Sequence, residues 1–310
     1  MAKIITVTFN PTIDKSTEVK GLIPEKKLRC SPPIFGPGGG GINVSRALKN
    51  LGKESLALYP SGGHSGKMLN DLMEGEGLTY KIVETKNRTR ENFIVLETTS
   101  NQQYRFGMPG NEIYEEECEA LIHLIEEQEA DFIVASGSLL PGMPADILMQ
   151  IAQIAKDKRS KLILDTSGEA LKKALEVGVY LLKPNVGELS SLVGQEEVDD
   201  SMIENIGKEI IQKGQCEVLV VSMGAQGAKL ISNNESIHIG SPVVKRVSTL
   251  GAGDSMVAGM VLSVSQKKSL REVLQYGIAC GTAATMTHGS ELCRREDVER
   301  LLKAMKLKSN

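Results

Sequence analysis

One short motif combines a flexible backbone turn with a carboxylate. Residues 249–254 read Thr-Leu-Gly-Ala-Gly-Asp; they follow a strand-like segment and lead into an apolar, helix-forming stretch, Ser255–Val264. Glycines at a helix start let backbone N–H groups converge on an anion, and the helix dipole favours negative charge there. Asp254 could accept a proton from an attacking hydroxyl. These are the parts that phosphoryl transfer requires, although Asp254 could equally be an ordinary N-cap.

A second motif is a run of four glycines. Residues 38–43 read Gly-Gly-Gly-Gly-Ile-Asn and enter an amphipathic helix predicted over Ile42–Leu51. Such a run allows a ligand to approach the backbone closely, but it can also be a plain flexible turn. The dinucleotide-binding pattern G-x-G-x-x-G fails, because Asn43 stands at its last glycine and prolines precede the run. A nicotinamide-dependent oxidoreductase is therefore disfavoured.

Two further motifs follow strands. Lys183-Pro184-Asn185-x-x-Glu188 comes at the end of an apolar strand, and Asn185 and Glu188 could hold Mg²⁺ directly or through water. The same spacing also describes a helix capping box, which is the simpler interpretation of that stretch alone. Residues 222–227 hold two glycines after a strand and suit a contact to nucleotide phosphate or ribose. Residues 61–67 only superficially resemble a P-loop, because the stretch is one residue short and Met68 replaces Ser or Thr.

These motifs need a scaffold of alternating strands and helices. The predicted strands are Ile4–Phe9, Ser55–Tyr59, Asp131–Ala135, Lys161–Leu164, Tyr180–Lys183 and Glu217–Ser222. The predicted helices between them are Ile42–Leu51, Tyr114–Gln128, Pro144–Lys156 and Ser201–Lys213, and the chain is mostly helical from Gly253 on. Several strands are apolar throughout, which is typical of strands covered on both faces. The alternation predicts an α/β fold: one three-layer α/β/α domain spanning residues 1–310, with a mainly parallel sheet.

Two stretches break this alternation. Residues 15–35 are long, polar and proline-containing, and residues 91–107 read as a hairpin whose turn lies near Ser100–Gln102. We expect them to form a small β-sheet lid outside the main layer. Basic side chains occur in or beside both stretches: Lys27, Arg29, Arg88, Arg90 and Arg105. This grouping indicates a site for an anionic substrate, since Arg binds phosphate through two parallel hydrogen bonds.

Composition excludes several classes of function. The formal net charge is −3, there is no Trp and aromatic residues make up 4%, so we expect no nucleic-acid partner. The five cysteines are scattered and the four histidines lack metal-ligand spacing, so neither a disulfide framework nor a zinc site is expected. The apolar run near the N-terminus is short, and no stretch approaches a membrane span. A cytoplasmic protein without a membrane partner is the natural expectation.

Five stretches together resemble the ribokinase-like PfkB carbohydrate kinases. They occur in the family's order and spacing: Asn10-Pro11-x-x-Asp14, the run 38–43, Ser136-Gly137-Ser138, Lys183-Pro184-Asn185-x-x-Glu188 and Gly251-Ala252-Gly253-Asp254. The resemblance covers essentially the whole chain and implies the ribokinase-like fold. It is closest to the 6-phosphofructokinase branch, through residues 25–30, the glycine run, residues 103–110 and residues 167–171.

The resemblance implies a role for each matching residue. The catalytic group would be the base Asp254 with an anion hole formed by Gly251, Ala252 and Gly253. The substrate would be bound by Asp14, Lys27, Arg29, Gly39, Gly40, Asn43, Arg90, Arg105 and Ser138. ATP would be held by Lys183, Asn185, Ser222, Gly224, Gly227, Ile278 and Thr282. Asn185 and Glu188 would organise Mg²⁺, and a K⁺ site could form at Ser248, Leu250, Ala284, Thr287, Gly289 and Glu291.

The resemblance also implies a reaction and a partner. The expected reaction transfers the γ-phosphoryl group of ATP to the C1 hydroxyl of fructose 6-phosphate, with a homodimer formed through the lid. The tagatose-6-phosphate kinase and 1-phosphofructokinase branches usually carry Lys at the position of Gly40, which favours fructose 6-phosphate without excluding the other two substrates. A non-catalytic sugar-phosphate sensor is the alternative from another class.

Overall fold

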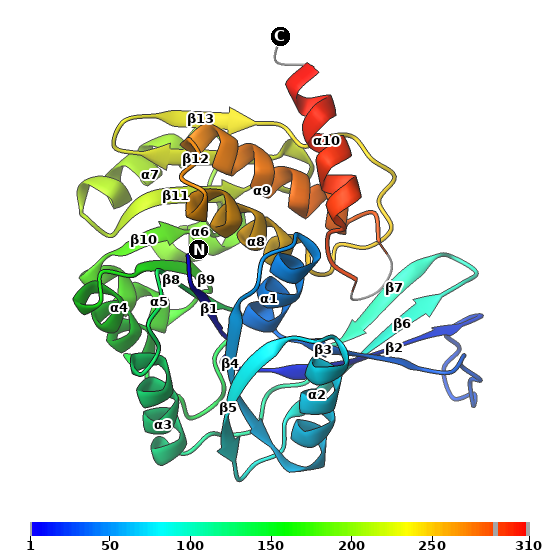
Figure 1. Cartoon of the computed structure of the whole chain (residues 1–310). Helices are drawn as coiled ribbons and strands as arrows, with labels where there is room; N and C mark the ends of the chain where they lie inside the picture. Colours follow the sequence, from blue (N-terminus) through cyan, green and yellow to red (C-terminus); the bar gives the residue numbers. More distant parts are fainter. Residues whose placement is uncertain (1, 288–290, 308–310) are drawn as a thin grey trace.

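Two β-sheets organise the chain, which a computed structural model describes over residues 2–287 and 291–307. The large sheet has nine strands in the order β13-β12-β11-β10-β9-β8-β1-β4-β5, and the small sheet has four in the order β3-β2-β6-β7. In Figure 1 helices cover both faces of the large sheet, and the small sheet projects from its side. The predicted three-layer α/β/α architecture with a small additional sheet is confirmed.

The large sheet is parallel except at one edge, where β12 pairs antiparallel with both β11 and β13. Its strands are β1 (Ile4–Val7), β4 (Leu56–Gly62), β5 (Thr79–Thr85), β8 (Phe132–Ser136), β9 (Lys161–Asp165), β10 (Val179–Leu182), β11 (Cys216–Ser222), β12 (Ala228–Ser232) and β13 (Ser236–Ile239). The central strands are buried on both faces, which explains why their sequences are apolar throughout instead of alternating.

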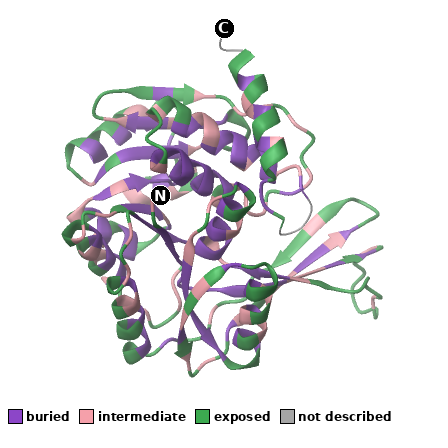
Figure 2. Cartoon of the chain, in the orientation of Figure 1, coloured by how far each residue is buried: buried purple, intermediate pink, exposed green. Residues whose placement is uncertain are grey.

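Ten helices in the described part of the chain flank this sheet. One face is covered by α1 (Gly40–Asn50), α2 (Gly63–Gly75), α8 (Ala252–Ser265), α9 (Leu270–Ala284) and α10 (Arg295–Leu307). The other is covered by α3 (Glu115–Glu126), α4 (Ile147–Asp157), α5 (Glu169–Val177), α6 (Val186–Val193) and α7 (Ile203–Gln212). Figure 2 shows the buried residues concentrated in the large sheet and on the helix surfaces against it.

The small sheet consists of β2 (Thr12–Val19), β3 (Ile34–Gly38), β6 (Arg90–Glu97) and β7 (Gln102–Phe106). The predicted hairpin is present as the antiparallel pair β6–β7, whereas β2 and β6 pair in parallel. The loop 20–33 joins β2 to β3 at the end of the small sheet remote from the large one (Figure 1). The predicted stretch 15–35 is therefore two short strands separated by this exposed loop.

The predicted elements were largely found, with one error beside the glycine motif. The segment before residue 249 was expected to be strand-like, but residues 240–249 have no regular structure and the preceding strand, β13, already ends at Ile239. Helix α8 begins at Ala252, so Asp254 lies inside its first turn. Within the described residues, no helix is long and apolar enough to cross a membrane.

Candidate active site

Asp254 lies where three elements meet at the C-terminal edge of the large sheet. It belongs to the first turn of α8, whose N-cap Gly251 has a left-handed backbone with φ 69°. Asn43, from the first turns of α1, donates from Nδ2 to Asp254 Oδ2 over 2.9 Å. Ser136, at the end of β8, donates from Oγ to Oδ1 over 3.5 Å. Segments more than 200 residues apart thus orient one carboxylate, in the crevice where open α/β sheets bind ligands.

The surroundings of Asp254 raise its pKa to about 6. Burial is the main cause, and the nearby negative charge of Asp165 adds to it, while the Asn43 hydrogen bond, the Lys183 ammonium and Ser136 oppose the rise. A carboxylate with this pKa is ionised at neutral pH but binds a proton more readily than an ordinary Asp. These are the properties of a general base.

Asp165 and Lys183 form a buried ion pair beneath the glycine turn. Lys183 Nζ lies 2.9 Å from Asp165 Oδ1, and the Lys183 residue is only 4% exposed. Burial alone would lower the pKa of Lys183, but the Asp165 carboxylate, aided by Glu188 and Asp254, holds it above its usual value. A Cβ atom on Gly253 would be 3.8 Å from Lys183 Nζ, so this ammonium faces the anion-hole turn.

Asp165 was not among the residues predicted from the sequence. Its signal was present, because it ends an apolar strand, β9, at the same sheet edge as Ser136 and Lys183. The carboxylate also accepts a long hydrogen bond of 3.5 Å from Ser136 Oγ. Ser136 therefore lies between the two acidic side chains, Asp165 and Asp254.

The glycine run packs the start of α1 against the protein's own strands. A Cβ atom on Gly40 would lie 2.4 Å from Ser136 Oγ and 2.5 Å from the Ser136 carbonyl carbon. A Cβ on Gly41 would lie 2.4 Å from Val7 O, and Gly39 has φ 110°. Glycine is therefore required at these positions by packing within the protein, and not only by the approach of a ligand. Gly40 also has no room for a lysine unless the loop shifts, so its identity alone is a weak guide to the substrate.

Asp14 anchors a polar cluster where the small sheet joins the large one. Its Oδ1 accepts a 3.1 Å hydrogen bond from Asn92 Nδ2, on the strand that pairs with β2. Burial raises the pKa of Asp14, opposed by Asn92 and by the positive charges of Arg46, Arg90 and Arg105. Two of the predicted phosphate-binding arginines are therefore close enough to act on this carboxylate.

Arg90 makes hydrogen bonds to the backbone. Its Nη1 donates to Met108 O over 2.8 Å and its Nη2 to Asn10 O over 2.9 Å. Its Nε is buried without a hydrogen-bond partner among the described residues, and burial lowers the pKa of this arginine. Arg90 therefore joins three segments of the chain, and a substitution there would disturb structure as well as any ligand contact.

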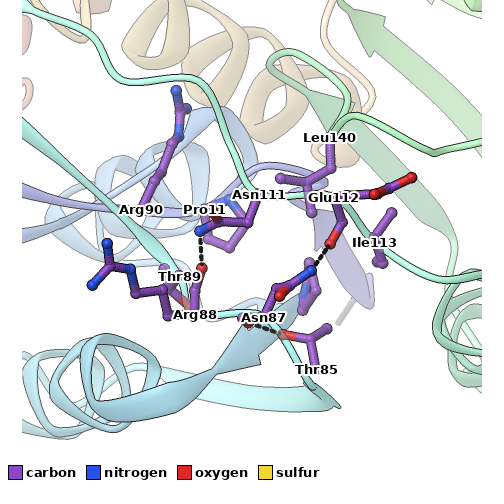
Figure 3. A pocket seen from close by; sticks show the side chains of 11 residues that line it. Pro11, Thr85, Asn87, Arg88, Thr89, Arg90, Asn111, Glu112, Ile113 and Leu140 are labelled. Atoms are coloured by element: carbon purple, nitrogen blue, oxygen red, sulfur yellow. Dashed lines mark hydrogen bonds between the residues drawn. The ribbon is translucent and has the colours of Figure 1, made fainter.

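Figure 3 shows the segment that leads into Arg90. Thr85 Oγ1 donates to Asn87 O over 2.9 Å, and Asn87 Nδ2 donates to Glu112 O over 2.7 Å. Asn111 Nδ2 donates to Arg88 O over 2.6 Å, so residues 85–90 are tied to residues 111–112. The Arg90 side chain extends away from this cluster. The cavity enclosed here, ≈ 20 Å³, has room for about one water molecule and not for a sugar.

The other predicted substrate residues divide into two groups. Ser138 follows β8 and accepts a hydrogen bond from Asn10 Nδ2 over 3.2 Å, which places it near Arg90. Arg105 donates from Nη2 to Thr249 Oγ1 over 3.1 Å, so it reaches the loop before the anion hole. Lys27 and Arg29, in contrast, are exposed in the loop 20–33 at the end of the small sheet, and the structure does not bring them to Asp254.

The predicted nucleotide residues converge on one cavity of ≈ 480 Å³. Those that line it are Ser222, Gly224, Gly227, Ile278 and Thr282, together with Ala252 and Gly253, which were predicted to form the anion hole. Asn185 lies beside this cavity, because its backbone forms a parallel bridge to Ser222. Because Ala252 and Gly253 line it, the cavity reaches the start of α8.

Asn185 and Glu188 form a helix capping box. Asn185 Oδ1 accepts from Glu188 N over 2.8 Å, and Glu188 Oε2 accepts from Asn185 N over 2.8 Å. The simpler interpretation of the spacing is therefore correct at the level of structure. The other carboxylate oxygen, Glu188 Oε1, takes no part in the cap. Glu188 is also close enough to Lys183 to raise the pKa of that lysine.

Oxygen atoms also converge at the predicted K⁺ position. Thr287 Oγ1 lies 2.9 Å from both Ala284 O and Glu291 O, and its single proton can be donated to either carbonyl. The backbone N–H of Leu250 donates to Ser248 Oγ over 3.1 Å. Gly289, the remaining predicted ligand, lies outside the described residues. No group of three or more His, Cys, Asp or Glu side chains in the described ranges could hold a metal ion.

Comparison with known proteins decides the family. A model of the family described as "pfkB family carbohydrate kinase" matches residues 7–297 of this chain.

The chain belongs to the pfkB family of carbohydrate kinases.

The relatives of this kinase include several that act on fructose phosphates. It is 41% identical over 303 residues to the ATP-dependent 6-phosphofructokinase isozyme 2 of Escherichia coli, covering 97% of this chain and 98% of the relative. It is 34% identical over 305 residues to the 1-phosphofructokinase of Bacillus subtilis, covering 98% and 99%. The crystal structure of phosphofructokinase-2 from Escherichia coli in complex with fructose-6-phosphate matches with a TM-score of 0.93 at 39% identity, covering 99% of this chain and 100% of that one.

Proposed function

We propose that this kinase transfers the γ-phosphoryl group of ATP to the C1 hydroxyl of fructose 6-phosphate, giving fructose 1,6-bisphosphate and ADP. The observation that carries the proposal is the position of Asp254. It follows Ala252 and Gly253, which line the ≈ 480 Å³ cavity, and its partner Asn43 accepts a hydrogen bond from Arg46, whose charge acts on Asp14. The 41% identity to a 6-phosphofructokinase favours this substrate over fructose 1-phosphate, whose kinase is 34% identical.

In this proposal, Asp254 acts as the general base. It accepts the proton of the C1 hydroxyl as the new O–P bond forms and the bond to the ADP oxygen breaks. The amides of Gly251, Ala252 and Gly253 and the ammonium of Lys183 stabilise the charge that develops on the transferred phosphoryl group. Asn43 keeps the carboxylate turned toward the substrate through its 2.9 Å hydrogen bond.

The residues present also fit Mg²⁺ and ATP. Mg²⁺ prefers oxygen ligands and keeps several waters, so Glu188 Oε1 and the Asn185 amide beside the nucleotide cavity would suit it. When bound with ATP, Mg²⁺ supplies charge neutralisation between the phosphates. We also propose a K⁺ site at Ser248, Leu250, Ala284, Thr287, Gly289 and Glu291, supported by the carbonyl oxygens that converge on Thr287.

The remaining residues would bind the sugar phosphate. Asp14, Gly39, Gly40 and Asn43 would face the sugar hydroxyls, and Arg90, Arg105 and Ser138 would bind the phosphate that the substrate already carries. Lys27 and Arg29 can contribute only if the loop 20–33 moves, or if a second subunit presents them, because this loop lies at the outer end of the small sheet.

We propose further that the small sheet is a lid over the sugar and the surface of a homodimer. A lid would exclude water, which competes with the sugar as phosphoryl acceptor. Support for a dimer comes from large apolar side chains exposed on this sheet and its loop: Leu22, Ile23, Ile34, Tyr104 and Phe106.

An assay of ADP release against fructose 6-phosphate, tagatose 6-phosphate, fructose 1-phosphate and unphosphorylated fructose tests the function. We expect fructose 6-phosphate to have the highest kcat/KM, and Asp254→Asn to lower kcat by about 10²–10⁴ while ATP still binds. A preference for either of the other sugar phosphates would reassign the substrate. Binding of sugar phosphate without turnover of any of them would instead support a non-catalytic sensor.

A further inference from the structure

Strand β7 presents two polar side chains to Ser248 and Thr249, in the loop that precedes α8. Because side chains alternate along a strand, Gln103 and Arg105 share one face, while Gln102, Tyr104 and Phe106 share the other. Gln103 is half-buried, whereas its neighbour Gln102 is exposed. The Gln103–Arg105 face is the one that meets residues 248 and 249, just before the anion hole.

Gln103 is the centre of the contacts on this face. Its Oε1 accepts from Arg105 Nε over 3.1 Å, from Arg105 Nη2 over 3.0 Å and from Ser248 Oγ over 3.3 Å. Arg105 Nη2 also donates to Thr249 Oγ1 over 3.1 Å. One amide oxygen therefore both orients the guanidinium and ties the small sheet to a loop about 145 residues away in the sequence.

A hydrogen bond within this loop connects Ser248 to Leu250, the residue before the proposed anion hole. Ser248 is buried, and its Oγ accepts from Leu250 N over 3.1 Å. The N–H groups of Val247 and Ser248 donate to Thr285 O, at the end of α9. Gly251, the residue after Leu250, is closely packed against Leu292, since a Cβ atom added to Gly251 would lie 2.3 Å from Leu292 Cδ2. A shift of Ser248 would therefore move the amides that face the transferred phosphate.

A cavity adjoins the contact between the small sheet and this loop. A cavity of ≈ 210 Å³ lies beside Gln103, with Ile94 and Leu96 of the sheet on one side and Val247 and Ser248 on the other. The hydrogen bonds between β7 and this loop thus lie next to open space. Such a contact can open and close without unfolding the sheet.

We propose that Gln103 is a positioning residue that couples the substrate's own phosphate to phosphoryl transfer. This inference rests on the proposed function. Arg105, when it binds the substrate phosphate, stays held by Gln103, and Gln103 in turn keeps Ser248 and the anion hole in their closed arrangement. Without Gln103, the sheet would dock less often over the sugar. Water could then attack the γ-phosphorus of ATP, the bond to the ADP oxygen would break, and free phosphate and ADP would leave.

The test compares three variants of the full chain. Gln103→Met removes the acceptor oxygen at nearly constant size, Gln103→Glu keeps an acceptor, and Gln102→Met is the matched control on the opposite face of β7. For Gln103→Met we expect kcat with fructose 6-phosphate to fall about five- to tenfold, as for one lost hydrogen bond. The ATP hydrolysed per sugar phosphorylated should at least double, and KM for ATP should stay unchanged. Gln103→Glu should restore the coupling, and Gln102→Met should match the wild type.

A second measurement is independent of the substrate. The chain has no Trp, so Leu96→Trp places a single fluorophore at the cavity beside Gln103. We expect iodide to quench this fluorophore more strongly when Gln103→Met is added, because the sheet undocks. Ser248→Ala removes the same hydrogen bond from the loop side and should act alike if Gln103→Met does not fold.

The outcomes separate the two proposals. Wild-type protein that is inactive on fructose 6-phosphate would overturn the proposed substrate, whereas the quenching experiment would still report on the contact. A folded Gln103→Met variant with unchanged coupling and unchanged quenching would overturn the role of Gln103. The same would follow if Gln102→Met produced equal effects.

Discussion

Asp254 illustrates how one residue acquires its chemistry from its neighbours. An isolated Asp would be fully ionised and weakly basic at neutral pH, but burial and the charge of Asp165 bring its pKa to about 6. Asn43, Lys183 and Ser136 limit the rise, so the ionised form still predominates at pH 7. The pKa of this base is therefore set by burial and by four residues, from α1, β8, β9 and the segment just after β10.

This pKa predicts the acid limb of the pH profile. The active form is ionised, so kcat/KM should fall as pH drops through about 6, with the slope expected for one proton. Asp165→Asn removes a negative neighbour, so the midpoint should move to lower pH, although the loss of the Lys183 partner should also lower kcat. The measurement is kcat/KM from pH 4.5 to 8.5, with Asp157→Asn, on exposed surface of α4, as the control. An unchanged midpoint in Asp165→Asn would contradict the electrostatic explanation.

At the scale of elements, the start of α6 can serve both structure and metal binding. Asn185 and Glu188 form one capping box, and Ser269 and Glu272 form another at the start of α9. The second box provides a comparison, because it is a cap with no predicted metal. Any effect of the first box on Mg²⁺ can therefore be separated from capping.

We expect Glu188→Gln and Glu272→Gln to lower the urea midpoint by similar small amounts, since both weaken a cap and its interaction with the helix dipole. Only Glu188→Gln should raise the Mg²⁺ concentration needed for half-maximal activity. Urea unfolding and Mg²⁺ titrations of both variants provide the measurement. If Mg²⁺ dependence were the same in the two variants, Glu188 would be a structural cap only.

The first turn of α1 is closely packed against the backbone of β1. Gly41→Ala would place a Cβ 2.4 Å from Val7 O, and backbone cannot rotate away as a side chain can. We expect a loss of about 1–3 kcal/mol in the free energy of unfolding, from overpacking. Gly75→Ala is the matched control, because its Cβ would meet nothing within 4 Å, and Ala should favour the end of α2 or be neutral. Equal urea midpoints for the two variants would show that the start of α1 adjusts freely.

At the scale of the whole molecule, the small sheet carries apolar surface that the chain itself does not cover. Ile34, at the start of β3, is 71% exposed, and Phe106 on β7 is 45% exposed. Exposed apolar residues gathered on a projecting sheet commonly mark a contact with another protein. A second copy of the chain, paired through this sheet, is the partner we propose.

The mass in solution tests this pairing. We expect the wild type to sediment at about twice 33.5 kDa and Ile34→Lys to sediment as a monomer, because the buried interface would receive an unpaired charge. Leu307→Lys, at an equally exposed apolar site on α10, should remain dimeric. A wild-type monomer at micromolar concentration would contradict the proposed pairing.

The sequence by itself determined the features that depend on local pattern. Apolar runs predicted the buried parallel strands, and the polar turn near Ser100 predicted the hairpin, since both follow from short-range burial and turn chemistry. The ordered motifs were also sufficient to name the family. Glu188 showed the limit of such patterns, because a capping box and a metal ligand have the same spacing in sequence.

Only the tertiary structure decided which side chains act on one another. Asp165 ends an apolar strand but belongs to none of the motifs, yet it lies against Lys183 and shifts the pKa of Asp254, because parallel strands end at one edge. Gln103 and Ser248 are 145 positions apart and meet only when the small sheet lies over the loop. Lys27 and Arg29, which the sequence grouped with the other basic residues, lie instead at the outer loop. Long-range distances are set by packing of the whole chain, and local pattern carries no information about them.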